Sequence, residues 1–139
     1  MIHAYDKNYL DLAMSHLGEM LDFAKRYDNL PLHVDEEYAK NTHFGQIIAP
    51  GVMSFMTVWA KYLENDFFGE ELLAGMSTKI EWHRPVFAND VLTGVAEITK
   101  LVERNPKNGL VELTIEITNQ NGEKVITDVT EAVVRRKLV

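Results

Sequence analysis

The sequence predicts an α+β fold in which an antiparallel sheet wraps around one long helix. Two observations support this fold class. In the first half of the chain apolar residues recur at steps of three and four, as on one face of a helix, whereas from residue 76 they recur at every second position, as on one face of a strand. No internal repeat or Pro/Gly/Ser-rich linker interrupts the chain, so we expect residues 1–139 to form a single domain.

The first half predicts helices on either side of a stiff turn. An amphipathic helix is expected to end at Tyr27, with the Ser15 hydroxyl as its cap. Pro31 disfavours helical backbone in the residue before it, so residues 28–33 should form an ordered turn. An acid-rich first turn then predicts a short helix over residues 35–41.

A second long helix is predicted to begin at Pro50 and Gly51. Its apolar side chains lie on nearly every face, which indicates a helix that is buried on most sides. The residues expected to form its main apolar stripe are Val52, Phe55, Met56, Trp59 and Leu63. Because this helix lacks a polar face, we expect it to fill the concave side of a curved sheet.

The second half predicts strands with alternating apolar and polar residues. They are expected near residues 76–83, 91–103, 110–119 and 124–136. The dipeptides Asn108-Gly109 and Asn121-Gly122 are typical of tight hairpin turns. Consecutive strands should therefore pair as an antiparallel meander.

Charge and composition exclude several classes of function. Lys plus Arg number 14 and Asp plus Glu 21, and the net charge of −7 disfavours binding to nucleic acid or anionic membranes. The absence of cysteine excludes thiol catalysis and Cys-based zinc sites. We see no secretory signal, and the longest mostly apolar stretch, 47–60, is too short to span a membrane. A cytoplasmic location is expected.

Three residues could carry acid/base chemistry. Asp28 and His33 lie on the proline-stiffened turn, where a carboxylate and an imidazole can hold one water molecule between them. Gly51 begins the buried helix, whose free N–H groups can stabilise an oxyanion. None of these residues is specific alone: Asp28 could be a plain helix-end or turn residue, and His33 a hydrogen-bonded turn residue.

The segment around these residues resembles the MaoC-like hydratase/dehydratase family, which contains (R)-specific enoyl-CoA hydratases. The family pattern resembles FAxxxDxxPxHxDxxxA, followed by FG and IAxG. The matching residues are Phe23, Ala24, Asp28, Pro31, His33, Asp35, Ala39, Phe44, Gly45, Ile48, Ala49 and Gly51. Further on, Arg84-Pro85-Val86 and Asp90-Val91-Leu92 resemble the family's RPV..GD.L stretch. The likeness spans residues 20–135.

The resemblance implies a hot dog fold and a lyase that adds water to a trans-2-enoyl thioester or removes it from a 3-hydroxyacyl thioester. Asp28 and His33 would activate the water, and the N–H of Gly51 would bind the thioester oxygen. No metal or redox cofactor is implied, and coenzyme A enters only as part of the substrate. The expected substrate is an acyl-CoA, or an acyl-carrier-protein ester, bound in a tunnel at the interface of a homodimer or larger homo-oligomer.

Two further sets of residues follow from the implied substrate. Phe55 and Trp59 could line the acyl tunnel, although aromatic residues at helical spacing are also typical of a core. Basic residues could meet the phosphates of coenzyme A or simply be solvated; they are Lys79, Arg84, Arg135, Arg136 and Lys137.

The sequence departs from the family pattern at three places. Leu30 stands where the family commonly has an amide, with Asn29 one residue earlier, and Pro50 stands where hydratases commonly have histidine. The N-terminal strand is expected to be short or absent. Two alternatives therefore stay open: a hot dog acyl-CoA thioesterase, and a non-catalytic acyl-thioester-binding or structural subunit. The sequence predicts neither the acyl chain length nor the physiological direction.

Overall fold

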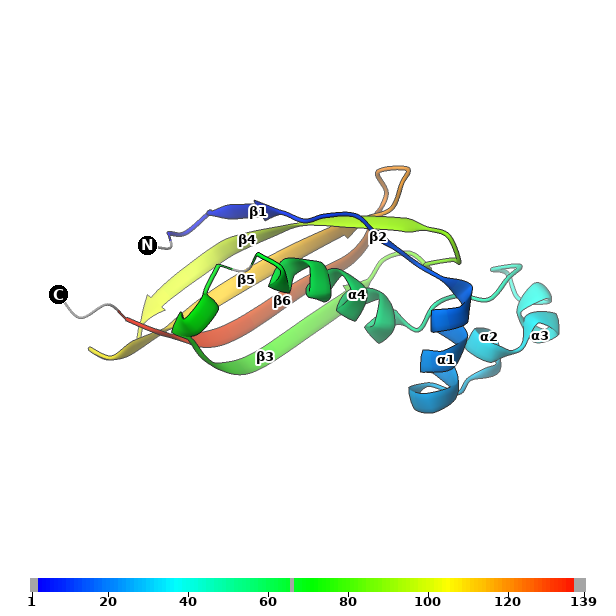
Figure 1. The fold of residues 1–139 in the computed structure, drawn as a ribbon, viewed down its shortest axis with the longest axis horizontal. Helices are drawn as coiled ribbons and strands as arrows, with labels where there is room; N and C mark the ends of the chain where they lie inside the picture. The colour runs from blue at the N-terminus through cyan, green and yellow to red at the C-terminus, as the bar shows by residue number, and fades with distance from the viewer. Residues whose placement is uncertain (1–2, 66, 137–139) are drawn as a thin grey trace.

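The structure, a computed structural model, describes residues 3–65 and 67–136. A curved antiparallel sheet forms most of it, and one long helix, α4, lies along the concave face (Figure 1). In chain order the elements are β1 (Lys7–Tyr9), β2 (Ala13–Met14), α1 (Leu17–Tyr27), α2 (Pro31–Val34), α3 (Glu36–Lys40), α4 (Gly51–Leu63), the 3-10 turn η1 (Gly69–Glu71), β3 (Leu72–Trp82), β4 (Val91–Glu103), β5 (Asn108–Thr118) and β6 (Lys124–Arg135). The predicted sheet around a helix is confirmed.

Helix α4 packs on the sheet through one side. Its Phe55, Val58 and Tyr62 are buried, at spacings of three and four residues. They belong to the same apolar cluster as the isoleucines on the inner face of the sheet, which are Ile98, Ile115, Ile117 and Ile126. Full burial of one such side chain contributes roughly 1.5–3 kcal/mol, so this cluster holds α4 firmly against the strands.

The predicted apolar stripe of α4 is partly wrong. Phe55 faces the core, but Val52, Met56 and Leu63 are each about half exposed, at 48%, 47% and 50%. The helix is therefore not buried on most sides within the single chain. Helix α4 has few polar residues, so no polar face identifies its outer side. The spacing of its apolar residues therefore does not indicate which side packs on the sheet.

The strand order differs from a simple meander. Strands β4, β5 and β6 do pair consecutively, but β3 pairs with β6 and not with β4, which gives the order β1-β4-β5-β6-β3. The prediction fails at the connection over residues 83–90, which carries no tight turn signal and crosses to the far side of β5 and β6. Alternation along a strand identifies its faces but not its neighbours.

The turn signals are only partly correct. Asn121-Gly122 forms the β5–β6 turn, and Gly122 adopts a φ of 75°. Asn108 and Gly109, however, are the first residues of β5, so the predicted turn there is wrong. The β4–β5 turn lies earlier, where Oδ1 of Asn105 accepts from the N–H groups of Lys107 and Asn108 at 2.8 and 2.9 Å. A local side-chain acceptor thus takes the place of the Asn-Gly turn.

Helix α1 starts later than predicted. His16 is its N-cap residue, and no side chain in the described part of the chain caps the helix. The Ser15 hydroxyl lies 3.1 Å from Sδ of Met20, so the predicted Ser15 cap is wrong. The backbone of Ser15 pairs instead with the connection before β4: its N–H donates to the Asp90 carbonyl at 2.9 Å and its carbonyl accepts from Asn89. The N-terminal strands β1 and β2 are short, as the sequence predicts, and the structure pairs both with β4.

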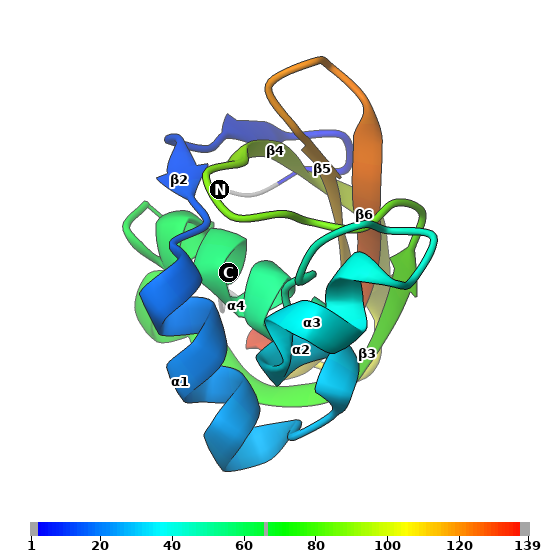
Figure 2. The ribbon, with the colours of Figure 1, turned by 90° about the vertical axis from the view of Figure 1, so that its right-hand side faces the viewer.

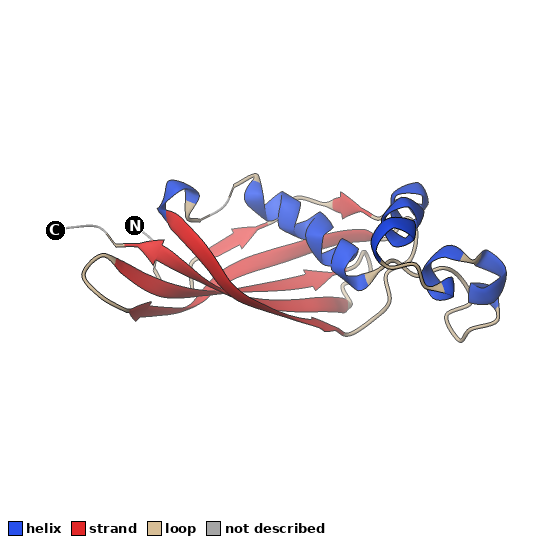
Figure 3. Ribbon diagram, turned by 90° about the horizontal axis from the view of Figure 1, so that it is seen from below, coloured by secondary structure: helices blue, strands red, loops and turns tan. Residues whose placement is uncertain are grey.

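Helices α1, α2 and α3 gather at one end of the sheet, beyond the start of α4 (Figures 2 and 3). They therefore lie around the residue where α4 begins, whereas β1 and the end of β6 lie toward the opposite end (Figure 1). Among the described residues, no helix is long and apolar enough to cross a membrane.

Candidate active site

The connection between α1 and α2 fixes Asp28 at the end of a helix. Asp28 is the C-cap residue of α1, and its N–H donates to the Ala24 carbonyl at 2.8 Å. Pro31 begins α2, a position where the missing N–H interrupts no helical hydrogen bond. Two backbone bonds of 2.8 Å, from Leu30 to Asp28 and from His33 to Leu30, close the segment. The ordered turn that Pro31 predicts is confirmed, and it includes the one-turn helix α2.

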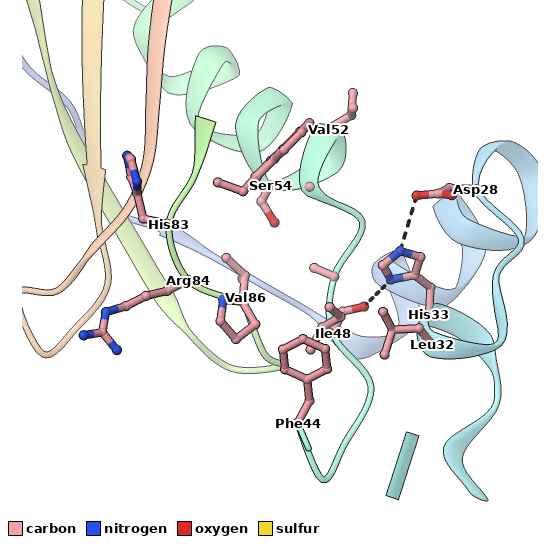
Figure 4. A pocket seen from close by; sticks show the side chains of 14 residues that line it. Asp28, Leu32, His33, Phe44, Ile48, Val52, Ser54, His83, Arg84 and Val86 are labelled. Carbon is pink, nitrogen blue, oxygen red and sulfur yellow. Dashed lines mark hydrogen bonds and ion pairs between the residues drawn. The ribbon is translucent and has the colours of Figure 1, made fainter. Parts of the chain in front are cut away.

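The Asp28 and His33 side chains face each other. Oδ2 of Asp28 lies 3.3 Å from Nε2 of His33, and Figure 4 shows the two groups pointing toward one another from neighbouring helices. The His33 side chain is 8% exposed and that of Asp28 is 40% exposed. The imidazole is thus fixed in the wall of the site, while the carboxylate reaches solvent.

A second contact orients the His33 ring. Nδ1 lies 2.7 Å from the carbonyl oxygen of Ile48. A carbonyl only accepts, so Nδ1 carries a hydrogen and donates it, and the ring presents Nε2 to Asp28. Ile48 pairs in turn with Phe87, and the N–H of Ala49 donates to the Val86 carbonyl at 2.8 Å. The connection before β4 therefore holds the acceptor that positions His33.

Gly51 places a backbone donor at the start of α4. The preceding residue, Pro50, has no side chain that caps the helix. Among the described residues no acceptor is bonded to the N–H of Gly51. The first N–H groups of a helix carry a partial positive charge, so this donor can stabilise an oxyanion.

These three residues line one pocket of about 520 Å³. The other residues that line it are Leu32, Phe44, Ile48, Ala49, Val52, Ser54, Trp82, His83, Arg84, Pro85 and Val86. The structure thus brings Asp28, His33 and Gly51 to the surface of a single, mostly apolar cavity. A ligand in this cavity could therefore contact a proton-transfer pair and an oxyanion donor at the same time. The catalytic roles of the three residues stay predictions.

Two lining residues escape sequence analysis. Ser54 is 4% exposed, and its Oγ points into the pocket, 3.5 Å from the Pro50 carbonyl (Figure 4). It lies three residues after Gly51, a spacing that places both on one helix face and was the available signal. Trp82 is the last residue of β3. Its position depends on long-range packing, for which the sequence carries no comparable signal.

Phe55 and Trp59 do not line this pocket. Phe55 is 6% exposed within the core, and Trp59 packs against that core with its ring centroid 5.9 Å from that of Phe55. Their contribution to an acyl tunnel between subunits stays a prediction.

Arg84 lines the pocket, but its side chain points away from Asp28 and His33 (Figure 4). Its Nη1 lies 2.9 Å from Oε2 of Glu123. A hydrogen bond from the Asn119 side chain and the charge of Arg84 hold the pKa of Glu123 below its ordinary value. Arg84 is therefore already paired with an acid at the surface.

The other described basic residues that could meet coenzyme A lie away from the pocket. Lys79 pairs with Glu81 at 3.2 Å. Arg135 and Arg136 lie at the end of β6 opposite to Ile126, the partner of Trp82. Lys137 is outside the described residues. Of these basic residues, the three that the structure describes, Lys79, Arg135 and Arg136, do not line the pocket.

The amide expected near the water is absent from the pocket. Leu30 is the N-cap residue of α2 and is 52% exposed, and neither Asn29 nor Leu30 lines the cavity. Among residues 3–65 and 67–136, no three His, Asp or Glu side chains are grouped as metal ligands.

Comparisons with known proteins extend over nearly the whole chain. A family model described as the FAS1-like dehydratase domain region matches residues 18–128. A solved structure from Archaeoglobus, named monoamine oxidase regulatory protein, is 31% identical with a TM-score of 0.86, over 98% of this chain and 92% of that chain. The (R)-hydratase of A. caviae, which is involved in PHA biosynthesis, is 27% identical with a TM-score of 0.76, over 98% of each chain.

A MaoC-like dehydratase from Rhodospirillum rubrum has the same fold. Its TM-score is 0.89 over 99% of this chain and 96% of that chain, at 21% identity. These matches confirm the hot dog fold. The residues matched by the family model include Asp28, His33 and Gly51. On these grounds the chain belongs to the MaoC-like hydratase/dehydratase family of hot dog proteins.

Proposed function

We propose that the protein is a lyase that adds water to a trans-2-enoyl-CoA to give an (R)-3-hydroxyacyl-CoA, or catalyses the reverse dehydration. The observation that carries this proposal is the 3.3 Å contact between Asp28 and His33 on the wall of a pocket that also holds the free N–H of Gly51. Family membership supplies the reaction class, and the pocket supplies an acid/base pair opposite an oxyanion donor.

The addition needs two proton transfers and one new C–O bond. Water held by the pair gives a proton to the Asp28 carboxylate while its oxygen attacks the β-carbon. The electron pair of the double bond moves toward the thioester oxygen, where the Gly51 N–H stabilises the negative charge. The Nε2–H of protonated His33 then donates to the α-carbon. Because both transfers come from one face, the addition is syn, and proton transfer from Asp28 to His33 restores the pair.

Pocket composition supports an acyl thioester as the ligand. Most lining side chains are apolar, and the polar ones are Asp28, His33, Ser54, His83 and Arg84. This suits an acyl chain joined to one polar reacting centre. The proposed steps require neither a metal nor a redox cofactor, and coenzyme A serves as part of the substrate.

We also propose that the working unit is a homodimer. Apolar side chains are exposed on both α4 and β3; they are Val52, Met56, Leu63, Leu72, Leu73, Met76 and Trp82. Val52 and Trp82 also line the pocket, so a second copy on this surface would cover the site as well.

Crotonyl-CoA tests the reaction with two simultaneous readouts. Loss of absorbance from the conjugated double bond measures hydration, and a thiol reagent measures hydrolysis of the thioester. We expect the double bond to disappear without release of thiol, and chiral analysis to give the (R)-3-hydroxy product. Thiol release would identify a thioesterase instead, and the absence of both signals would favour a non-catalytic subunit.

A further inference from the structure

The indole of Trp82 lies directly against Gly51. A Cβ atom added at Gly51 would come within 2.3 Å of Nε1 and 2.4 Å of Cε2 of Trp82. Only a residue without a side chain can therefore occupy the start of α4 while Trp82 keeps its place. The indole nitrogen thus lies beside the backbone group that is proposed to hold the thioester oxygen.

The Nε1–H of Trp82 is available to a ligand. An indole N–H only donates, and it usually finds an acceptor when it is buried. Among the described residues no acceptor is bonded to this group, and Trp82 is 53% exposed at the pocket wall. It is the last residue of β3, in register with Ile126 of β6, so its backbone is fixed on a paired strand.

Resting on the proposed function, we infer that the Trp82 indole N–H is a second donor to the thioester oxygen, next to the N–H of Gly51. The ligand group it recognises is the enolate oxygen that forms when water adds to the β-carbon. One oxygen has lone pairs for two donors, and two donors on neighbouring elements, α4 and β3, restrict its position more strongly than one. Trp82 would then contact the reacting group itself.

The flat indole also shapes this corner of the site. It covers one side of Gly51 and limits the approach of water to the oxygen. Fewer competing water molecules strengthen both hydrogen bonds, because the local dielectric constant is lower. Negative charge develops on the oxygen only in the transition state. Loss of the Trp82 N–H should therefore lower kcat more than it raises KM.

Trp82→Phe isolates the N–H, because phenylalanine keeps an aromatic ring and has no donor. Removal of a fully desolvated oxyanion donor lowers kcat by about 10²–10³-fold in other enzymes, so for this half-exposed group we expect a loss of at least about tenfold with crotonyl-CoA. Tyr9→Phe is the control, since it removes an aromatic donor from an exposed residue of β1 that does not line the pocket, and it should keep near-normal kcat. Thermal unfolding of both variants checks that the fold is retained.

The protein has two tryptophans, so Trp82→Phe and a second variant, Trp59→Phe, also locate the ligand. In Trp59→Phe the tryptophan emission comes from Trp82 alone, and in Trp82→Phe it comes from Trp59 alone. Titration with acetoacetyl-CoA should change the emission strongly in Trp59→Phe and weakly in Trp82→Phe. The ultraviolet absorbance of its enolate form, measured at one pH, should be higher for ligand bound to wild type than for ligand bound to Trp82→Phe.

These readouts separate failure of this inference from failure of the proposed function. If wild type hydrates crotonyl-CoA and Trp82→Phe matches it in kcat and in enolate absorbance, the donor role of Trp82 is wrong and the hydratase proposal stands. If wild type does not hydrate crotonyl-CoA, the enolate absorbance decides: a lower value in Trp82→Phe supports the donor, and equal or absent enolate signals in both proteins overturn it.

Discussion

Asp28 and His33 occupy different environments, and this difference suits different tasks. His33 is enclosed and is fixed by its bond to the Ile48 carbonyl, so its Nε2 has one defined direction. Asp28 is partly exposed at a helix end, where substrate and water can reach its oxygens. A positioned proton donor beside an accessible carboxylate is what the addition of water requires.

We expect Asp28→Asn and His33→Ala each to lower kcat for hydration of crotonyl-CoA by at least about a hundredfold, the usual contribution of a general acid or base. Asparagine keeps the shape of Asp28 and loses the proton acceptor. Initial rates at saturating substrate measure the effect. Asp35→Asn is the control, because Asp35 lies on the same segment outside the pocket and caps α3, a role that asparagine also performs. Near-normal turnover by either pocket variant would remove that residue from the mechanism.

Gly51→Ala tests the contact between Gly51 and Trp82. The added methyl group would overlap the indole at 2.3 Å, so Trp82 or the start of α4 must move. Overpacking of this kind typically costs about 1–3 kcal/mol, and we expect a lower Tm together with at least about a tenfold loss of kcat/KM. Thermal unfolding and the hydration assay measure the two effects.

Two companion variants show whether the overlap is the cause. In Gly51→Ala/Trp82→Ala the overlap is absent, so the loss of stability caused by the added methyl group should vanish relative to Trp82→Ala alone. Gly18→Ala adds a methyl group that would meet no atom of the described residues within 4 Å outside its own helix backbone and chain neighbours, and it should leave activity unchanged. A Gly51→Ala protein with wild-type Tm and rate would contradict the proposed packing.

The sequence predicts the part of the site that is local in the chain. Asp28 and His33 lie on either side of Pro31, and Gly51 follows within the same patterned segment, so their residue types and spacing are informative. Trp82 reaches Gly51 only because β3 pairs with β6 and passes the start of α4. That contact depends on strand order, which the alternation of residues does not encode.

Strands β3 and β6 bury an acid between two hydroxyl groups. Asp128 is fully buried, and its carboxylate oxygens are hydrogen-bonded to Thr78 and Thr130, whose own oxygens are 2.9 Å apart. Three hydrogen bonds between these oxygens need three hydrogens. The two threonine hydroxyl groups supply two, and a protonated Asp128 carboxyl group would supply the third. Burial raises the pKa of Asp128 above its ordinary value, partly opposed by the bonds from the two threonines.

This raised pKa predicts a pH-dependent stability. Between the ordinary Asp value of about 3.9 and the raised value, the folded protein binds a proton that the unfolded chain has released. The free energy of unfolding therefore decreases as pH rises through this window. Asp128→Asn has no such proton, so its stability relative to wild type should increase with pH. Thermal unfolding from pH 4 to pH 8, with the exposed acid variant Asp11→Asn as control, measures the trend; parallel profiles of wild type and Asp128→Asn would contradict it.

Individual elements were predictable to within a few residues where a local cause ends them. Helix α1 ends before the turn around Pro31, and α4 begins after Pro50, because proline limits the backbone on either side. The β4–β5 turn was misplaced since Asn105 offers a side-chain acceptor that competes with the Asn-Gly signal. The Asn105 acceptor and the Asn108-Gly109 dipeptide are both local turn signals. The pairing of β4 with β5 determines which of them forms the turn.

At the scale of the whole molecule, the edge of the sheet formed by β3 is unpaired within the described residues. Strand β3 pairs with β6 along one edge, and within the described residues no strand covers its other edge. Leu72, Leu73 and Met76 of this strand are each 44–54% exposed. An uncovered apolar edge strand favours association, and the composition of one chain does not reveal which of its apolar residues stay exposed.

We expect the wild-type protein to be a dimer in solution and Met76→Glu to be monomeric. Met76 is 54% exposed on β3, and a charge there would lie within the apolar interface and remain unpaired. Light scattering coupled to size-exclusion chromatography measures the mass. Because Val52 and Trp82 line the pocket beside this surface, the monomer should also hydrate crotonyl-CoA more slowly.

Tyr9→Glu provides the matched control at the opposite edge of the sheet. Tyr9 is 75% exposed on β1, so the substitution introduces the same charge on an exposed strand residue without touching the β3 surface. This variant should remain dimeric and active, which would attribute the effect of Met76→Glu to the β3 surface and not to added negative charge. A monomeric wild type with full activity would show instead that one chain holds a complete site, and that the exposed α4 and β3 residues have another purpose.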